Sequence, residues 1–228
     1  MADHHERRLL IFTRAPEAGR VKTRLIPTLG AEAAAALHVR LLDRALCTAL
    51  DAEVAPVELW CAPDATHPHF ERLRQRWPQI ALRAQCEGDL GLRMATALAD
   101  ALSEDRHAVL IGSDCPELSV ADLEQAFTSL ERGMDAVLGP AQDGGYVLIG
   151  LSRGMPARSK SRRLMLFEAL FEGVDWGTSK VSTQTRERLH AAGMRWDELP
   201  ARADVDRPED LTRLPAQLLG ATDRLVKR

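Results

Sequence analysis

The sequence predicts a doubly wound α/β domain, with a mainly parallel sheet and helices on both of its faces. Short apolar runs that are typical of strands alternate along the chain with longer segments of helical periodicity. The run Ala108-Val109-Leu110-Ile111 is continuously apolar, as expected for a central strand that is covered on both faces. The chain has 228 residues, which allows one domain or two small ones, and we expect a single domain over residues 1–228.

In the first half of the chain, apolar runs predict strands at residues 9–13, 57–61, 80–85 and 108–111. Helices are expected at residues 31–50, 70–77, 88–102 and 119–133. In the first helix, leucines and alanines recur every three or four residues, which places them on one face. Pro78 stops the second helix, and Ser119 with Asp122 three residues later forms a capping-box-like start for the fourth.

In the second half, strands are expected at residues 136–139, 146–150 and 195–199. The segment 151–161 is rich in Ser, Arg, Gly and Pro, so we expect a mobile connection or lid there. A helix is expected after Trp176-Gly177-Thr178, ending near residue 192, and a terminal helix starts at Asp206. These elements are less regular than those of the first half, which makes the final third the expected place for a substrate-specific lobe.

A basic loop follows the first expected strand. Residues 14–24 carry four cations, Arg14, Arg20, Lys22 and Arg24, and one acid, Glu17, although the whole chain has a net charge of −3. In an α/β sheet, a loop at the carboxyl end of a strand can direct backbone N–H groups and cations at phosphate. The loop therefore predicts an anion site, and the alternative is a solvated surface loop.

A carboxylate follows the most apolar strand, in the sequence Gly112-Ser113-Asp114-Cys115-Pro116. Open α/β sheets bind ligands at the carboxyl ends of their strands, where we expect Asp114 to lie. Mg²⁺ is usually held by one or two carboxylates together with phosphate oxygens and water, so Asp114 is a candidate metal ligand. The alternative is an aspartate that hydrogen-bonds within its own turn.

A second group of carboxylates, Asp204, Asp206 and Asp210, lies near the end of the sequence. Asp206 could offer a second ligand to the same metal. Asp206 followed three residues later by Glu209 is also a helix N-cap signature, and one carboxylate can serve both roles.

Two glycine-marked turns are further candidates. Asp143-Gly144-Gly145-Tyr146 indicates a tight turn between strands, whose glycines would let a substrate lie against the backbone. Gly88-Asp89-Leu90-Gly91 opens a helix and, with Arg93, could hold a base or a ribose. In both places a turn alone is also a sufficient explanation.

Composition and missing motifs argue against several classes of function. The net charge of −3 and the pI near 6.2 leave no extended basic face for nucleic acid. The four cysteines form no C-x-x-C pair, which argues against a disulfide frame or a zinc site. No apolar stretch approaches the ~20 residues of a membrane span, and the first residues lack the apolar core of a signal peptide, so a cytoplasmic location is expected. Nucleophile-elbow, dinucleotide and P-loop motifs are absent from the sequence.

Taken together, several motifs resemble the GT-A-type glycosyltransferases that are associated with radical-SAM and selenodomain proteins, commonly labelled arsenosugar-biosynthesis glycosyltransferases. The motifs are Thr13-Arg14-Ala15-Pro16 with Gly19-Arg20-Val21-Lys22-Thr23-Arg24-Leu25, Gly88-Asp89-Leu90-Gly91, Ser113-Asp114-Cys115-Pro116, Asp143-Gly144-Gly145-Tyr146 and Trp176-Gly177-Thr178-Ser179. The resemblance extends over residues 9–211. It implies a nucleotide-diphospho-sugar transferase fold, a Rossmann-like sheet with one reversed strand near the acceptor side.

The resemblance also implies roles for residues. Asp114 would bind a divalent metal, Mg²⁺ or Mn²⁺, and Asp206 would complete the metal site. Nucleotide and phosphate binding is expected of Arg14, Arg20, Lys22, Arg24, Gly88, Asp89, Gly91 and Arg93. Acceptor binding is expected of Gly144, Gly145, Tyr146, Trp176 and Thr178. The expected catalytic residues are Lys22, Asp114 and Asp143, with Asp143 as the base. Residues 7–140 would form the nucleotide-binding part and residues 141–228 the acceptor side.

The expected reaction is glycosyl transfer from a nucleoside-diphosphate sugar to a small-molecule acceptor. Lys22-Thr23-Arg24-Leu25 is also similar to a segment of the 2-phospholactate guanylyltransferases, so nucleotidyl transfer from a nucleoside triphosphate is an alternative. A third possibility is a non-catalytic nucleotide-binding partner of a neighbouring enzyme. The chain departs from the family pattern at residues 153–163, through Arg153, Arg158, Lys160, Arg162 and Arg163, which leaves the acceptor side open. Nothing in the sequence sets an oligomeric state.

Overall fold

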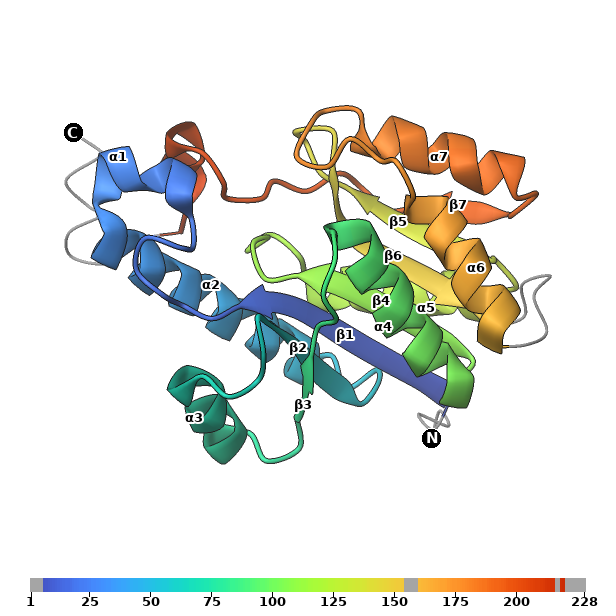
Figure 1. Cartoon of the computed structure of the whole chain (residues 1–228), viewed down its shortest axis with the longest axis horizontal. Helices are drawn as coiled ribbons and strands as arrows, with labels where there is room; N and C mark the ends of the chain where they lie inside the picture. The colour runs from blue at the N-terminus through green and yellow to red at the C-terminus, as the bar shows by residue number, and fades with distance from the viewer. Residues whose placement is uncertain (1–5, 154–159, 216–217, 220–228) are drawn as a thin grey trace.

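In the computed structural model, which describes residues 6–153, 160–215 and 218–219, seven strands form one sheet in the order β3-β2-β1-β4-β6-β5-β7 (Figure 1). The strands are β1 (Arg7–Arg14), β2 (Val57–Ala62), β3 (Ala81–Ala84), β4 (His107–Gly112), β5 (Ala136–Pro140), β6 (Tyr146–Ser152) and β7 (Trp196–Glu198). Of these, β6 alone runs antiparallel to its neighbours, β4 and β5. The expected mixed sheet with one reversed strand is confirmed.

Helices cover both faces of this sheet. They are α1 (Ile26–Leu29), α2 (Ala31–Asp51), α3 (Pro68–Arg76), α4 (Leu90–Glu104), α5 (Val120–Glu131), α6 (Lys160–Phe171) and α7 (Val181–Ala191), with 3-10 turns η2 (Thr23–Leu25) and η3 (Pro208–Arg213). On one face α2, α3 and α5 pack against Leu9 and Ile11 of β1, and on the other α4, α6 and α7 pack against Leu10 and Phe12. Because successive strand residues point to opposite faces, a strand buried on both faces is continuously apolar there, as β1 is from Leu9 to Phe12.

The C-terminal segment, defined here as residues 199–215, runs back from β7 towards α1 (Figure 1). It passes the end of β4, where the Val205 N–H donates a hydrogen bond to the Asp114 carbonyl oxygen at 3.0 Å. It then joins a separate apolar cluster, in which Val205 and Leu211 are buried with Leu37 of α2. The segment therefore carries the late carboxylates of the sequence to the carboxyl edge of β1 and β4.

The strands and most helices lie where the sequence predicts them, with ends shifted by a few residues. Two expectations are wrong. Residues 151–161 are not one connection, because Leu151 and Ser152 belong to β6 and α6 begins at Lys160. The expected terminal helix is the 3-10 turn η3, which begins at Pro208.

Sequence analysis missed α6 because its first turn shares the Ser- and Arg-rich composition of the preceding connection. Its buried residues, Phe167, Leu170 and Phe171, have the three- and four-residue spacing of a helix face. Of the basic residues in this region, Arg153 is exposed. Residues 154–159, which include Arg158, lie outside the described residues, as do the side chains of Lys160, Arg162 and Arg163.

All four cysteines, Cys47, Cys61, Cys86 and Cys115, are free thiols. Cys61 and Cys115 are buried, and burial raises the pKa of each thiol to about 12. Both thiols are therefore expected to be protonated at neutral pH.

The first turn of α4 packs tightly against α6 through Gly91. A Cβ at this position would lie 2.9 Å from the Phe171 carbonyl oxygen and 3.0 Å from Phe171 Cβ. Gly91→Ala should therefore lower the free energy of unfolding by about 1–3 kcal/mol, because backbone atoms must move to admit the methyl group. Chemical denaturation followed by circular dichroism measures this change. Gly112→Ala is the matched control, since its Cβ would meet nothing within 4 Å. Equal stability changes in the two variants would contradict the packing role of Gly91.

Candidate functional site

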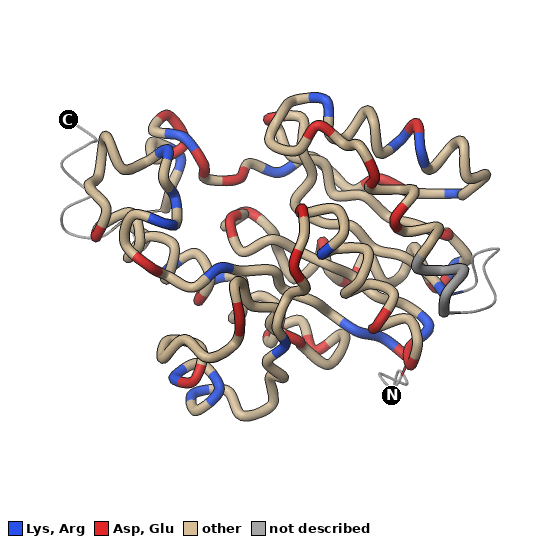
Figure 2. The backbone as a smooth tube through the Cα atoms, viewed as in Figure 1, with Lys and Arg blue, Asp and Glu red and all other residues tan. Residues whose placement is uncertain are grey.

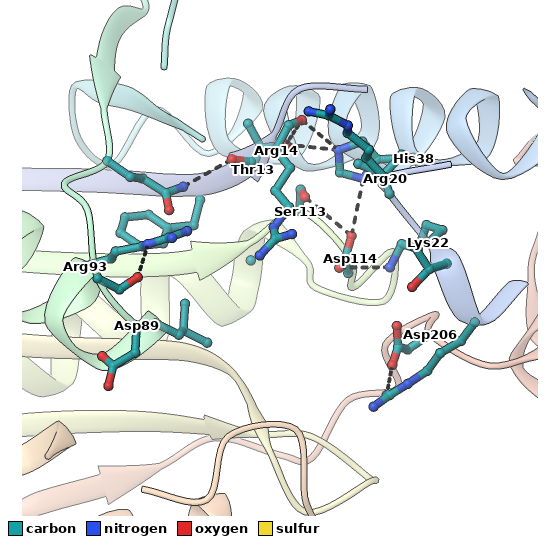
Figure 3. Close-up of a pocket in the computed structure, with 18 residues that line it drawn as sticks. Thr13, Arg14, Arg20, Lys22, His38, Asp89, Arg93, Ser113, Asp114 and Asp206 are labelled. Carbon is teal, nitrogen blue, oxygen red and sulfur yellow. Dashed lines mark hydrogen bonds and ion pairs between the residues drawn. The ribbon is translucent and has the colours of Figure 1, made fainter. Parts of the chain in front are cut away.

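A cavity of about 700 Å³ opens at the carboxyl edge of β1 and β4 (Figure 3). Its wall combines the end of β1, the basic loop, the residues after β4 and the start of α4. Seven of the eight residues expected to bind nucleotide line this first cavity, namely Arg14, Arg20, Lys22, Arg24, Gly88, Asp89 and Arg93. The parallel pairing of β1 with β4 brings these distant segments together, because it sets both strand ends at one edge.

Lys22 and Asp114 are in direct contact within the first cavity (Figure 3). Lys22 Nζ lies 2.8 Å from Asp114 Oδ2 and donates a hydrogen bond to the Val205 carbonyl oxygen at 2.6 Å. The Lys22 side chain is 3% exposed and that of Asp114 45%. The Lys22 backbone has φ 49° and ψ 40°, a left-handed conformation that is unfavourable for a residue with a Cβ. The two contacts of the ammonium hold the loop in this conformation.

Asp114 is a carboxylate at neutral pH. Partial burial opposes its ionisation, but the Lys22 ammonium and the His38 ring outweigh burial and hold the pKa of Asp114 below its usual value. The first cavity thus contains one matched pair of opposite charges, Lys22 and Asp114.

Sequence analysis missed His38, which lies on the buried face of α2. Its Nε2 lies 3.0 Å from the Arg14 carbonyl oxygen, and its Nδ1 lies 3.8 Å from Asp114 Oδ1. A carbonyl oxygen can only accept a hydrogen bond, so Nε2 is the donor. His38 therefore fixes the end of β1 beside Asp114. The sequence does contain one indication of this role. His38 lies between Leu37 and Leu41, on the apolar face of the helix that follows the basic loop.

Arg24 and Asp206 form a second ion pair at the same cavity. Asp206 does not cap η3, so that expectation is wrong. Asp210 does so instead, since its Oδ2 accepts hydrogen bonds from the backbone N–H groups of Asp206 at 3.0 Å and Arg207 at 2.7 Å. The Asp206 carboxylate is thereby left to face Arg24. Figure 2 shows that acidic residues recur along the C-terminal segment where it crosses from β7 towards α1.

A second cavity, of about 300 Å³, adjoins the first. Asp143 and four of the five residues expected to bind acceptor line it, namely Gly145, Tyr146, Trp176 and Thr178. Arg24, Asp114 and Asp206 line both cavities. The two ion pairs therefore lie along the boundary between the cavity expected for nucleotide and the cavity expected for acceptor.

Side chains of the second cavity are held by local contacts. Asp143 Oδ1 accepts a hydrogen bond from the Gly145 N–H at 2.9 Å, and Thr178 Oγ1 donates one to the Asp175 carbonyl oxygen at 2.7 Å. The rings of Tyr146 and Trp176 meet edge to face, with centroids 6.3 Å apart. Trp176 Nε1 is buried, and within the described part of the chain it has no hydrogen-bond partner.

Gly91 and Gly144 line neither cavity. Gly91 is required by the packing of α4 on α6, as described above. Gly144 has φ 94°, and a Cβ there would lie 2.3 Å from the Ser179 carbonyl oxygen. The lack of a side chain at Gly144 therefore allows the loop that carries Trp176 and Thr178 to pack against it. Gly144 itself does not face the second cavity.

Asp204 is a further carboxylate of the second cavity, which sequence analysis named only as part of an acidic group. Burial raises the pKa of Asp204 to about 6, and the nearby carboxylate of Asp143 adds to the effect. Asp204 is therefore mostly ionised above pH 7.

No three His, Cys, Asp or Glu side chains of the described residues gather closely enough to hold a metal ion. Two carboxylates, Asp114 and Asp206, line the first cavity together with its five cations. Mg²⁺ is usually bound by one or two carboxylates and takes its other ligands from phosphate and water, so these two residues fit its donor set. In the part of the chain that the structure describes, none of the helices combines the length and hydropathy needed to cross a bilayer.

The fold and the position of the cavities define a class, the nucleotide-diphospho-sugar transferase type of α/β fold, in which a GT-A-like sheet binds its ligands at the carboxyl edge. The chain belongs to the family described as "Uncharacterized protein conserved in bacteria (DUF2064)", whose profile matches residues 45–178. No curated protein matches the chain.

Solved structures share this fold. The chain is similar to a "putative nucleotide-diphospho-sugar transferase" from Desulfovibrio desulfuricans G20, with 31% identity over 97% of this chain and 94% of that one, and a TM-score of 0.78. It also resembles 4-diphosphocytidyl-2C-methyl-D-erythritol synthase from Anaerococcus prevotii, with 11% identity, coverage of 99% and 98%, and a TM-score of 0.60. A third is Rv0371c from Mycobacterium tuberculosis H37Rv in complex with manganese, with 17% identity, coverage of 91% and 96%, and a TM-score of 0.52. The last two likenesses show the fold alone.

Proposed function

We propose that this protein is a metal-dependent transferase that moves a glycosyl group from a nucleoside-diphosphate sugar to a small acceptor. The observation that carries the proposal is the 2.8 Å contact between Lys22 and Asp114 at the boundary of the two cavities. A donor diphosphate in the first cavity would meet cations and a carboxylate suited to a metal ion. The likeness to a nucleotide-diphospho-sugar transferase supports this class of donor. The narrower assignment to the arsenosugar group linked to radical-SAM proteins stays a prediction.

In this proposal the cations of the first cavity bind the diphosphate. Arg14, Lys22 and Arg24 hold phosphate oxygens through charge-assisted hydrogen bonds, which contribute roughly 1.5–3 kcal/mol each. Lys22 is the most constrained of the three, because its ammonium is buried and held by two partners. Charge that develops on the leaving diphosphate is then neutralised by these bound cations.

Asp114 and Asp206 are the residues that would hold Mg²⁺ or Mn²⁺. A divalent cation bound there supplies positive charge against the leaving diphosphate. In the structure both carboxylates are paired with cations, Asp114 with Lys22 and Asp206 with Arg24. We propose that ligand binding exchanges these partners, so that Lys22 and Arg24 turn to phosphate and the carboxylates become free for the metal. Metal and nucleotide should therefore bind cooperatively.

Asp143 is the proposed base of the second cavity. One of its carboxylate oxygens is engaged by the Gly145 N–H, which leaves the other to accept the proton of an acceptor hydroxyl. The acceptor oxygen forms a bond to the anomeric carbon while the bond from that carbon to the diphosphate oxygen breaks. The electron pair of the broken bond leaves with the nucleoside diphosphate, and the proton stays on Asp143.

Nucleotidyl transfer is the second candidate, and the charge of the first cavity favours it. Five cations line that cavity, Arg14, Arg20, Lys22, Arg24 and Arg93, which suits a triphosphate as well as a diphosphate. The fold likeness to 4-diphosphocytidyl-2C-methyl-D-erythritol synthase is compatible with this reaction. In that case a substrate phosphate attacks the α-phosphorus and pyrophosphate leaves.

A thermal-shift panel tests both candidates. Nucleoside triphosphates, diphosphates and nucleoside-diphosphate sugars are each added with and without Mg²⁺ or Mn²⁺, since a ligand that binds only the folded state raises the melting temperature. Stabilisation by a nucleoside-diphosphate sugar that requires the metal supports glycosyl transfer. Stabilisation by one triphosphate alone, followed by pyrophosphate release, selects nucleotidyl transfer. Metal-independent binding without turnover would contradict both and indicate a nucleotide-binding partner protein.

Lys22→Met should weaken the binding of the stabilising nucleotide by at least about tenfold, because a buried charge-assisted contact is lost while the shape of the side chain is kept. Isothermal titration of the nucleotide with Mg²⁺ measures the change. Lys180→Met is the matched control, because it makes the same change at a lysine that lines neither cavity, is 72% exposed and lies 3.9 Å from Asp175 at the surface. We expect a loss of less than about threefold for the control, since exposed charges are screened. An equal loss of nucleotide affinity in the two variants would contradict the phosphate-binding role of Lys22.

A further inference from the structure

The two adjoining cavities differ in charge. The first is lined by five cations, Arg14, Arg20, Lys22, Arg24 and Arg93, and three carboxylates, Asp89, Asp114 and Asp206. The second is lined by one cation, Arg24, and four carboxylates, Asp114, Asp143, Asp204 and Asp206. A phosphorylated donor is therefore matched by the first cavity, whereas an anionic molecule in the second cavity would face like charge.

Ion pairs account for only part of this negative charge. Asp114 is paired with Lys22 and Asp206 with Arg24. Among residues 6–153, 160–215 and 218–219, neither Asp143 nor Asp204 makes an ion pair. A divalent cation held by Asp114 and Asp206 would offset those two carboxylates and leave Asp143 and Asp204 uncompensated. The second cavity thus keeps its negative charge in the working enzyme.

The rest of the second cavity is apolar and aromatic. Its lining includes Met94, Leu110, Leu148, Val181, Tyr146 and Trp176. Pockets that bind small organic molecules have this character, with an apolar wall and a few polar groups that fix orientation, and a volume of about 300 Å³ lies at the small end of their range. The buried Trp176 Nε1 offers a hydrogen bond that nothing in the described chain accepts.

From this combination we infer that the acceptor is a small molecule with an apolar body and a neutral or protonatable head, such as an alcohol or an amine, which gives a proton to Asp143 when it attacks, and that phosphorylated and carboxylated acceptors are rejected. The inference rests on the proposed function, in which the second cavity holds the acceptor. It follows from the like-charge repulsion that an anionic head would meet at Asp143 and Asp204, since such repulsion suppresses wrong partners. It also weighs against nucleotidyl transfer, which needs a phosphate nucleophile in this cavity.

Four probes with one body and different heads test the inference: 2-phenylethylamine, 2-phenylethanol, 3-phenylpropionate and 2-phenylethyl phosphate. Each is titrated into the full-length protein at about pH 8, where carboxylates are ionised, and at low ionic strength, where screening is weak. The readout is the indole N–H signal of Trp176 in nitrogen-15 NMR spectra, assigned with Trp176→Phe. Trp60 and Trp196 serve as internal references, because their indole N–H groups already donate to Glu58 and Glu198.

The amine and the alcohol should bind at least about tenfold more tightly than the carboxylate and the phosphate. In Asp143→Asn/Asp204→Asn this preference should fall to less than about threefold, while Asp89→Asn, which changes a carboxylate of the first cavity only, should keep it. Melting temperatures of the variants show whether they remain folded. Anionic probes that bind as tightly as the alcohol would overturn the inference, as would the absence of any Trp176 shift at millimolar probe.

These outcomes are distinguishable from failure of the proposed function. If no nucleotide stabilises the protein, the proposed function fails whatever the probes do. If a nucleoside-diphosphate sugar binds with metal and the anionic probes are preferred, the inference about the acceptor fails alone.

Discussion

Asp114→Asn should lower the rate of transfer by at least about 100-fold, measured with the donor and metal that stabilise the protein most. The change keeps the size of the side chain but removes the charge that pairs with Lys22 at 2.8 Å and that would bind the metal. Without this carboxylate, neither the metal nor Lys22 is held in position to stabilise the negative charge that develops on the leaving group. Each 1.36 kcal/mol of transition-state stabilisation that is lost lowers the rate about tenfold. Steady-state product formation measures the effect.

Asp51→Asn is the control for this experiment, since it makes the same chemical change at an exposed residue that ends α2 and lines neither cavity. We expect the rate to fall by less than about fivefold. An Asp114→Asn enzyme that kept the activity of this control would place the chemistry elsewhere in the protein.

Asp122→Ala should lower the free energy of unfolding by about 2–4 kcal/mol, because one buried carboxylate joins two parts of the chain. Its side chain is 4% exposed and accepts hydrogen bonds from Arg202 Nη2 at 2.6 Å and Nε at 3.1 Å. It also completes the capping box of α5, whose Ser119 was recognised from the sequence. The full penalty of an unpaired buried charge is not expected, since Arg202 is 31% exposed. Urea denaturation measures the loss.

Glu198→Ala is the control, because Glu198 makes a similar two-bond pair with Arg186 at the surface. Such pairs contribute about 1 kcal/mol or less.

The pH dependence of the stability of Asp122→Ala gives an independent check. Burial opposes ionisation of Asp122, but the hydrogen bonds from Arg202 and Ser119 outweigh it and lower its pKa. The stabilisation is complete above the unfolded-state pKa of about 3.9 and is lost as the pH falls through the lower folded-state pKa. The decrease in the free energy of unfolding caused by Asp122→Ala should therefore become smaller below about pH 4.

The fold was largely predictable because its signals are local. The central strands are apolar runs of the right length, as β1 and β4 show, and the capping box at Ser119 marks the start of α5. The order of the strands depends on long-range pairing. One reversed strand was expected, from the family resemblance alone, and the structure identifies it as β6. Helix α6 was missed because local composition and tertiary packing conflict there, and packing of Phe167 and Phe171 decides the outcome.

The candidate site was predictable where one rule of topology applies. Strand ends of a parallel sheet share an edge, so the basic loop after β1 and Asp114 after β4 could be expected to meet. What could not be foreseen are contacts set by tertiary packing. His38 carries no motif, the Val205 carbonyl oxygen carries no side-chain signal, and the capping role passes from Asp206 to Asp210 through the path of the C-terminal segment.

The late arrival of that segment has a consequence for synthesis of the protein. Val205, whose carbonyl oxygen accepts the hydrogen bond from Lys22, lies 183 positions after it in the chain. At translation speeds of about 5–20 residues per second, Val205 is added roughly 10–40 s after Lys22. A ribosome-bound chain therefore displays the basic loop before the loop has its final shape. A ligand that requires this final shape of the loop can therefore bind only after Val205 has been added to the chain.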